Sequence, residues 1–223
     1  MKYPIGIQSF DQIIERGYVY VDKTNLIYRL VNEGKIYFLS RPRRFGKSLL
    51  VSTLKSYFLG RKDLFNGLAI SSLETEWTEH PVFHIDFNST NFAKEVTLEQ
   101  KINFMLNSWS TQYGLPSQEG KIDLGDRFVE ILSGVHKITG QPAVVLIDEY
   151  DKPLLDVLDV DKNLEEYNRN ILKAFYSVFK AADEHLRFVL LTGVTKFSQV
   201  SVFSGFNQPK DISLDARYEA FGG

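Results

Sequence analysis

The chain has 223 residues, of which 43% are hydrophobic and 24% are charged, and its formal net charge is −2. These values are typical of an ordinary globular protein, long enough for one sizeable core or for a domain with an appendage. The near-neutral net charge excludes a nucleic-acid-binding surface that extends over the whole chain, although a local basic patch remains an alternative. The absence of cysteine excludes disulfides, thiolate metal sites and cysteine nucleophiles.

Residues 1–35 form a preamble before the first core strand. The N-terminus lacks the apolar core of a signal peptide, and no apolar run in the chain approaches a membrane span, which favours a cytoplasmic protein without a membrane partner. Tyr18 to Val21 (YVYV) predicts a short β segment. A helix capped by Asp22 or Thr24 follows, and Gly34 ends it.

Residues 36–60 predict a strand, a basic loop and a helix. Ile36 to Leu39 is typical of a short buried strand, and apolar residues recur at helical spacing from Leu50 until Gly60. Because backbone N–H groups and the helix dipole converge on an anion at such a junction, the loop predicts a phosphate-binding P-loop. Lys47 would reach the β- and γ-phosphates of ATP, and the Ser48 hydroxyl would ligate Mg²⁺. The expected nucleotide-binding residues are Arg41, Pro42, Arg43, Arg44, Phe45, Gly46, Lys47, Ser48 and Leu49.

The loop departs from the G-x-x-x-x-G-K-[ST] pattern at its first position, where Arg41 stands. Gly46-Lys47-Ser48 alone is weak evidence, and the strand before it, the helix after it and a second motif a hundred residues on strengthen it. Arg41, Arg43 and Arg44 either are solvated surface charges or form additional contacts with nucleotide phosphate. In a P-loop protein, the preamble either lies beside the adenine or only packs on the core.

The middle of the chain supplies an edge strand and two helices. Residues 82–87 (VFHIDF) alternate between apolar and polar, which indicates a half-exposed edge strand. Thr97 and Gln100 suit a capping box that opens the next helix. Residues 114–125 are the most loop-like stretch, and a helix over 128–138 ends at Gly140.

Residues 143–149 (AVVLIDE) predict a strand buried on both faces that ends in two acids. Asp148 stands where a strand of an open α/β sheet meets the ligand crevice. In a P-loop protein, Asp148 would hold Mg²⁺ and Glu149 would be the general base that polarises the attacking water. The alternative is that two acids at a strand end simply meet solvent.

The last elements complete an α/β domain. A helix over 167–179 leads to an apolar strand over 186–191, and Thr192 at its tip is the candidate catalytic residue that senses the γ-phosphate. Residues 211–214 (DISL) predict a short fifth strand. Apolar strands separated by helices predict a three-layer P-loop NTPase fold with a mainly parallel sheet in the order 5-1-4-3-2.

Several motifs together resemble a known family. The segments PIGIQSF, YVYVDKT, RPRRFGKS, LIDEYDKP and LTGVTKFSQVSVFS occur in that order, and the likeness runs from Pro4 to about Ser213. The chain resembles the bacterial and archaeal AAA-ATPase-like family, some members of which carry a C-terminal nuclease-like domain of the PD-(D/E)xK class. The resemblance implies ATP binding through Gly46, Lys47 and Ser48, Mg²⁺ at Ser48 and Asp148, and Glu149 as catalytic base. It also implies that Arg41 is the family's own form of the loop.

The expected organisation is a preamble over 1–35, an ATPase core over 36–215, and the truncated start of a missing C-terminal region over 216–223. The leading hypothesis is an ATPase coupled to a nuclease-like domain, so that nucleic acid is a partner only indirectly. The alternatives are a nucleotide-dependent switch with little hydrolysis and, disfavoured by the net charge, a nucleic-acid-binding module. Arg187 and Arg217 are guesses for an arginine finger, which an oligomer would otherwise supply.

Overall fold

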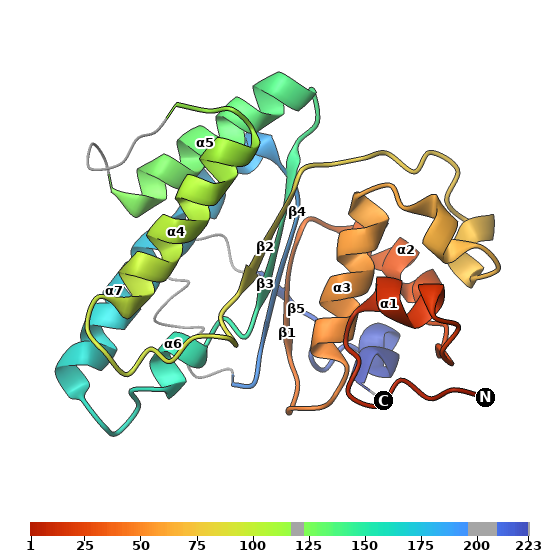
Figure 1. Cartoon of the computed structure of the whole chain (residues 1–223), viewed down its shortest axis with the longest axis horizontal. Coiled ribbons are helices and arrows are strands. Elements are labelled where there is room, and N and C mark those ends of the chain that lie inside the picture. The colour runs from red at the N-terminus through yellow and green to blue at the C-terminus, as the bar shows by residue number, and fades with distance from the viewer. Residues whose placement is uncertain (117–122, 196–208, 223) are drawn as a thin grey trace.

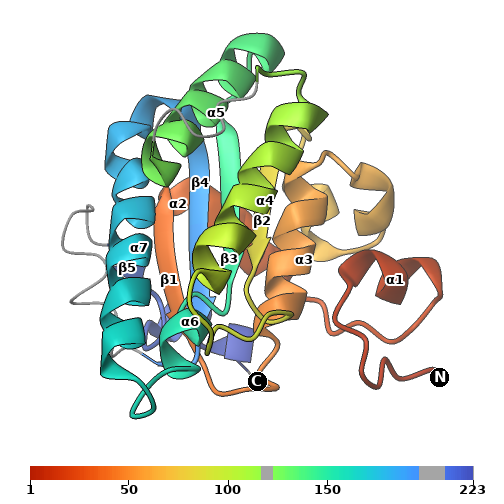
Figure 2. The same ribbon diagram turned by 60° about the vertical axis from the view of Figure 1, so that its left-hand side comes forward.

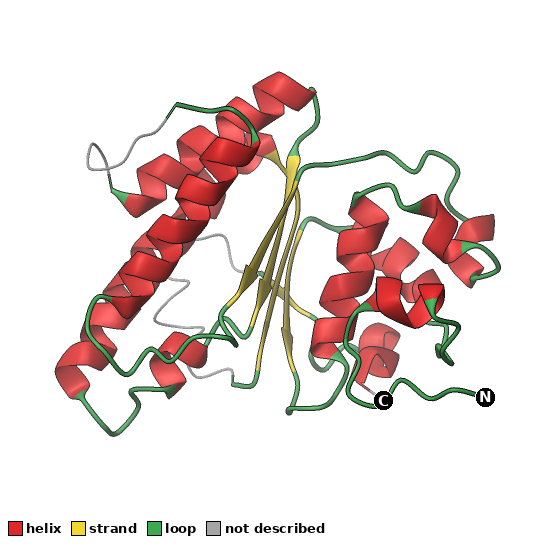
Figure 3. Ribbon diagram, in the orientation of Figure 1, coloured by secondary structure: helices red, strands yellow, loops and turns green. Residues whose placement is uncertain are grey.

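The computed structural model describes residues 1–116, 123–195 and 209–222. A five-stranded sheet lies between two layers of helices (Figures 1 and 3). The strands are β1 (Ile36–Ser40), β2 (Val82–Asp86), β3 (Ala143–Asp148), β4 (Leu186–Gly193) and β5 (Lys210–Asp211). All are paired in parallel, in the order β2-β3-β4-β1-β5. The predicted fold class and strand order are therefore confirmed.

Two apolar cores form because alternate residues of each central strand face opposite sides of the sheet. One core packs α4 (Thr97–Gln112), α5 (Leu124–Thr139) and α7 (Lys162–Ala181) against strand residues such as Phe83, Val145 and Val189. The other core packs α1 (Phe10–Glu15), α2 (Thr24–Glu33) and α3 (Lys47–Phe58) against Tyr37, Leu146 and others (Figure 2).

The remaining elements are short. Two 3₁₀ turns, η1 (Lys62–Phe65) and η2 (Ala69–Ser72), fill the predicted loop-rich connection after α3, and α6 (Lys152–Leu155) follows β3. The turn η3 (Asp183–His185) precedes β4, and η4 (Ala216–Gly222) ends the described chain. In the second core, Phe10 of α1 and Tyr218 of η4 are both fully buried. Segments from both ends of the chain therefore pack on the same face of the sheet.

Two local predictions were wrong, and a third, the short fifth strand, was right in its existence and wrong in its bounds. Residues 18–21 form no strand, because the backbone there meets no strand edge and the Tyr20 ring packs on Phe10 instead. Helix α4 begins at Thr97 itself and its N-cap is Val96, at φ 56°, so no capping box forms. The fifth strand is two residues long and begins one residue early, and Ile212 beyond it turns into the core.

The helix bounds extend the predicted ones. Helix α5 starts at Leu124 because Asp123 caps it through the amide of Asp126, and Gly140 ends it in the left-handed conformation as predicted. Helix α7 starts at Lys162 because the Asp161 carboxylate accepts from two amides of its first turn. Part of the predicted loop over 114–125 and the motif residues 196–204 lie outside the described residues.

Candidate functional site

The loop between β1 and α3 has the shape of an anion site. Its backbone turns through left-handed conformations at Arg44 (φ 70°) and Gly46 (φ 71°). Gly46 is the N-cap of α3 and brings no side-chain acceptor to the first amides of the helix. The amides of a twelve-residue helix therefore begin at the point where the sequence predicts the phosphates.

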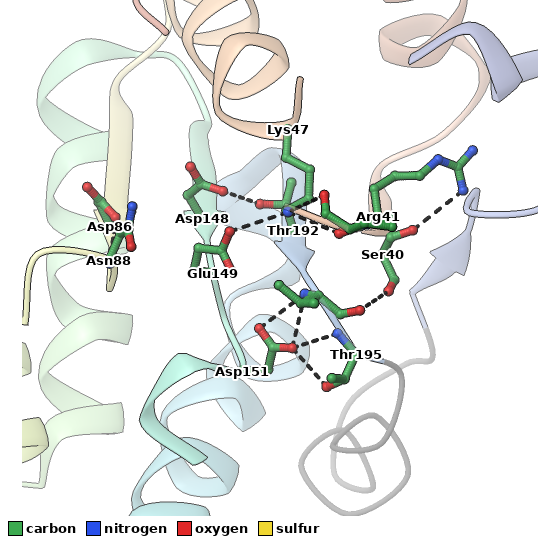
Figure 4. Close-up of polar contacts among 12 residues, drawn as sticks. Ser40, Arg41, Lys47, Asp86, Asn88, Asp148, Glu149, Asp151, Thr192 and Thr195 are labelled. Atoms are coloured by element: carbon green, nitrogen blue, oxygen red, sulfur yellow. Dashed lines mark hydrogen bonds and ion pairs between the residues drawn. The ribbon is translucent and has the colours of Figure 1, made fainter. Parts of the chain in front are cut away.

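Lys47 lies at the centre of the site (Figure 4). Its side chain is only 3% exposed, and its ammonium donates to the carbonyl oxygens of Arg41 (3.0 Å) and Pro42 (3.2 Å). The same nitrogen lies 3.3 Å from Oε1 of Glu149. The structure thus brings the predicted P-loop lysine and the predicted general base into an ion pair, even though 102 positions separate them in sequence (149 − 47).

The two acids at the end of β3 have different surroundings. Asp148 is buried, and it accepts a hydrogen bond from the hydroxyl of Thr192 on the neighbouring strand β4. Glu149 follows in a left-handed conformation (φ 55°), which turns its carboxylate toward Lys47. Burial raises the pKa of the Glu149 carboxyl, and the nearby Lys47 ammonium opposes that rise.

The arrangement of Asp148, Glu149 and Thr192 follows from the sheet. Because β4 lies between β1 and β3, Thr192 is at the tip of the strand that separates the loop from the acids, as predicted. Thr192 is fully buried, and its hydroxyl holds Asp148. Asp86 of β2 stands beside Asp148 in register, and its Oδ1 accepts from the amide of Asn88.

Ser48 and Asp148 line one polar cleft of about 660 Å³. A hydroxyl and a carboxylate are the hard oxygen ligands that Mg²⁺ prefers, and Mg²⁺ at phosphate sites usually takes few protein ligands. The donor set therefore fits the ion. Within residues 1–116, 123–195 and 209–222, no group of three or more His, Asp or Glu side chains comes together as a metal site.

The arginines of the loop have separate positions. The guanidinium of Arg41 donates to the carbonyl oxygen of Ser213, beyond β5, so its side chain points away from Lys47 (Figure 4). Arg43 and Arg44 are exposed on the loop, as are Pro42 and Phe45. Arg41 therefore contributes to the site through its backbone carbonyl.

Neither candidate arginine finger faces Lys47. Arg187 stands near the start of β4, at the opposite end of that strand from Thr192, and donates to the carbonyl oxygen of Val31. Arg217 of η4 pairs with Glu33 (3.1 Å) and with Asp215. Both guanidinium groups are therefore engaged elsewhere in this chain.

Sequence reasoning missed Asp151. Its carboxylate is fully buried and accepts from the amides of Val194 (3.0 Å) and Thr195 (2.7 Å) and from the Thr195 hydroxyl (2.8 Å). The Tyr150 hydroxyl donates to the Thr195 carbonyl oxygen (2.9 Å). The residues directly after the acid pair thus fix the chain that leaves β4. The available signal was the third acid in LIDEYDKP, three positions after Asp148.

Comparison with known proteins found a family model and a relative that match this chain. A family model described as "Predicted AAA-ATPase" matches residues 4–203. A protein of Azotobacter chroococcum mcd 1, described as "Uncharacterized protein in vnfD 5'region", is 44% identical over 224 aligned positions, which cover 100% of this chain. The chain spans 43% of that relative's length. Among the described helices, none is both long enough and apolar enough to cross a membrane.

Proposed function

The chain belongs to the family described as "Predicted AAA-ATPase", and we propose that it binds Mg·ATP at the loop over 41–49 and hydrolyses it with Glu149 as general base. The observation that carries the proposal is the buried contact between Lys47 and Glu149 at the N-terminus of α3. A P-loop lysine, a helix N-terminus and a carboxylate that can hold a water are the parts that phosphoanhydride hydrolysis uses.

Nucleotide binding would change the partners of Lys47. Its ammonium now bonds two loop carbonyls and Glu149. The β- and γ-phosphates of ATP would compete for the same donor, and a charge-assisted bond to phosphate is among the strong hydrogen bonds in proteins. Phosphate binding would therefore free the Glu149 carboxylate to face the attacking water.

Ser48 and Asp148 would hold Mg²⁺, which would neutralise charge on the phosphate oxygens. Thr192 keeps the Asp148 carboxylate in one orientation through its hydroxyl. Among the described residues, the one side-chain hydrogen bond of Asp148 uses Oδ1 and leaves Oδ2 available for the ion. We also propose that Thr192, near the end of β4, is the residue that senses the γ-phosphate.

In the hydrolytic step, the water oxygen would attack the γ-phosphorus as ADP leaves, and Glu149 would take the water proton. Burial makes this carboxylate a stronger base because it raises the pKa of Glu149. The carboxylate is 15% exposed, which leaves room for a water molecule to approach it.

Phosphate release measured on the wild type and on Glu149→Gln tests this proposal. Because glutamine cannot take the proton, we expect Glu149→Gln to keep Mg·ATP binding and to lose about a hundredfold or more of its turnover. Glu166→Gln, at an exposed glutamate of α7, is the matched control and should turn over like the wild type. If Glu149→Gln turned over ATP as fast as the wild type, Glu149 would not be the general base. If the wild type bound Mg·ATP without hydrolysing it, the result would favour the nucleotide-dependent switch.

We further propose that residues 36–215 are the ATPase core, with residues 1–35 packed on it and residues 216–223 leading to a C-terminal region. This chain spans 43% of its relative's length. A nuclease-like domain coupled to hydrolysis would lie in the part of such a longer protein that this chain does not cover. An oligomer would supply the arginine finger, since Arg187 and Arg217 are bonded elsewhere. Nucleic acid would be a partner only through that further domain, and the protein would act in the cytoplasm.

A further inference from the structure

A polar cavity of about 610 Å³ lies at the opposite end of the sheet from the loop between β1 and α3. Its lining comes from α2, the end of α3, the start of β4 and the connections that lead into β2 and β3. Figure 1 shows these connections at one end of the strands and the N-terminal end of α3 at the other. The volume is within the range for small-molecule sites, which is roughly 300–1,000 Å³. A ligand there would leave the proposed ATP site free.

Arg187, at the start of β4, brings a positive charge to this cavity. Its Nη2 donates to the carbonyl oxygen of Val31 (3.1 Å), and no carboxylate of the described chain forms an ion pair with it. Its other side-chain nitrogens are not buried without a partner, so they keep contact with solvent where Arg187 lines the cavity. A guanidinium with free N–H groups can bind a carboxylate through two parallel hydrogen bonds.

Glu74, in the connection to β2, brings a negative charge to the same cavity. The Tyr57 hydroxyl donates to its Oε2 (2.5 Å), and the amide of Glu76 donates to its Oε1 (2.9 Å). Burial favours the protonated carboxyl, but these hydrogen bonds outweigh it and hold the pKa of Glu74 below its usual value. Because a carboxylate has about four lone-pair sites, it can accept further hydrogen bonds from a ligand.

His80 adds a hydrogen-bond acceptor to the cavity. The residue is 8% exposed, and its Nδ1 lies 3.0 Å from the carbonyl oxygen of Pro142. Because a carbonyl oxygen only accepts, Nδ1 carries the proton of the neutral ring and Nε2 is an acceptor. Burial and, less strongly, the Arg187 charge lower the pKa of His80, which favours this neutral form. Among the described residues, Nε2 has no hydrogen-bond partner and is not fully buried, so a ligand can reach it.

A ligand of one charge would match only part of this lining. Inorganic phosphate would meet the Arg187 guanidinium but also the Glu74 carboxylate, and a polyamine would meet Glu74 but also Arg187. A zwitterion matches both, because its carboxylate accepts from Arg187 while its ammonium donates to Glu74 and to Nε2 of His80.

We propose that this cavity binds a free α-amino acid, with its carboxylate on Arg187 and its ammonium on Glu74 and His80. The proposal does not need phosphates at Lys47, so it is independent of the proposed ATPase activity. It adds a second small-molecule site, at the end of the strands where β2, β3 and β4 begin.

Thermal denaturation of the wild type with each of the standard free amino acids, followed by calorimetric titration of the one that stabilises it most, tests the proposal. We expect at least one amino acid to bind. Its methyl ester lacks the negative charge and its N-acetyl derivative lacks the positive charge. Each derivative should bind at least about tenfold more weakly, because it leaves one charged side chain of the cavity unmatched.

Two substitutions assign the two charges to their residues. Arg187→Gln should bind the amino acid and its methyl ester within about twofold of each other, because glutamine forms no ion pair with the carboxylate. Glu74→Gln should do the same for the amino acid and its N-acetyl derivative, and it keeps the test valid if Arg187→Gln fails to fold. The matched controls are Arg16→Gln and Glu79→Gln, at exposed positions outside the cavity lining, and both should discriminate like the wild type.

Binding of none of the amino acids would overturn the proposal, and so would equal affinity for the amino acid and both derivatives. Unchanged discrimination in folded Arg187→Gln and Glu74→Gln would overturn the assignment to this cavity, as would an equal loss of discrimination in the two controls. These outcomes do not depend on Mg·ATP binding at Lys47, so the two proposals fail separately.

Discussion

Lys47 and Glu149 form an ion pair in which the lysine is buried and the glutamate is partly exposed. The Lys47 side chain is 3% exposed and that of Glu149 is 15% exposed. A buried ammonium needs a partner, and here two backbone carbonyls and one carboxylate supply it. The pair explains why these two residues would act together, since any anion that binds Lys47 competes with Glu149.

Asp151 gives a prediction that concerns stability. Its buried carboxylate accepts from two amides and one hydroxyl at the end of β4. Asp151→Asn removes the charge and turns a donor toward these donors, so we expect a loss of roughly 2–3 kcal/mol in the free energy of unfolding. Urea denaturation followed by circular dichroism measures it.

Asp159→Asn is the control for that substitution, because Asp159 is exposed and asparagine tolerates its left-handed backbone (φ 58°). It should change the free energy of unfolding by less than about 0.5 kcal/mol. Equal stability of Asp151→Asn and wild type would show that the contacts of Asp151 do not hold the end of β4.

At the scale of elements, His80 joins the start of β2 to the end of α3. Its amide donates to the carbonyl oxygen of Phe58 (2.7 Å), its ring meets that of Phe58 edge-on, and its Nδ1 lies 3.0 Å from the Pro142 carbonyl oxygen. Burial lowers the pKa of His80 below its usual value of 6.5. The folded protein therefore favours the neutral ring.

The pH dependence follows from that shift. Below about pH 6.5 the unfolded chain takes up a proton at His80 that the folded chain resists, so this residue makes the protein less stable as pH falls toward its lowered pKa. We expect the wild type to lose more stability between pH 7.5 and pH 5.5 than His80→Gln loses, by thermal denaturation at each pH. Equal losses in the two proteins would contradict the role of His80.

The elements that the sequence predicted well are those with the strongest patterns. A strand that is buried on both faces needs apolar residues throughout, and a strand that is buried on one face needs them at alternate positions. Continuous apolar runs therefore identified β3 and β4, and alternation identified β2 as an edge strand. The predicted strand at 18–21 failed because β propensity needs a free strand edge to pair with, and side-chain packing on α1 prevailed.

The candidate site was predictable only in part. Lys47 and Glu149 could be named because their roles attach to local motifs, and their ion pair is a contact that the fold creates. The role of Asp151 depends on Thr195, 44 positions later, and on Gly193, where a Cβ would come within 2.5 Å of the Tyr150 ring. A close approach between a strand end and a turn that lie far apart in the chain leaves no periodic signal in a single sequence.

At the scale of the whole molecule, the parallel sheet brings the site together. The ends of β1, β2, β3 and β4 meet at one edge, where the ligand crevice of an open α/β sheet is expected. The N-terminal segment and η4 reach the same edge beside α3. The loop that would bind the phosphates and the acid pair are therefore neighbours, as one nucleotide would require.

The most direct test of the central claim is calorimetric titration of Mg·ATP into the wild type, Lys47→Ala and Lys62→Ala. Loss of Lys47 removes a charge-assisted contact of roughly 1.5–3 kcal/mol, so we expect its affinity to fall by about ten- to a hundredfold or more. Lys62 is exposed on η1 and should be dispensable. Wild-type affinity in Lys47→Ala, or equal weakening by both substitutions, would contradict nucleotide binding at this loop.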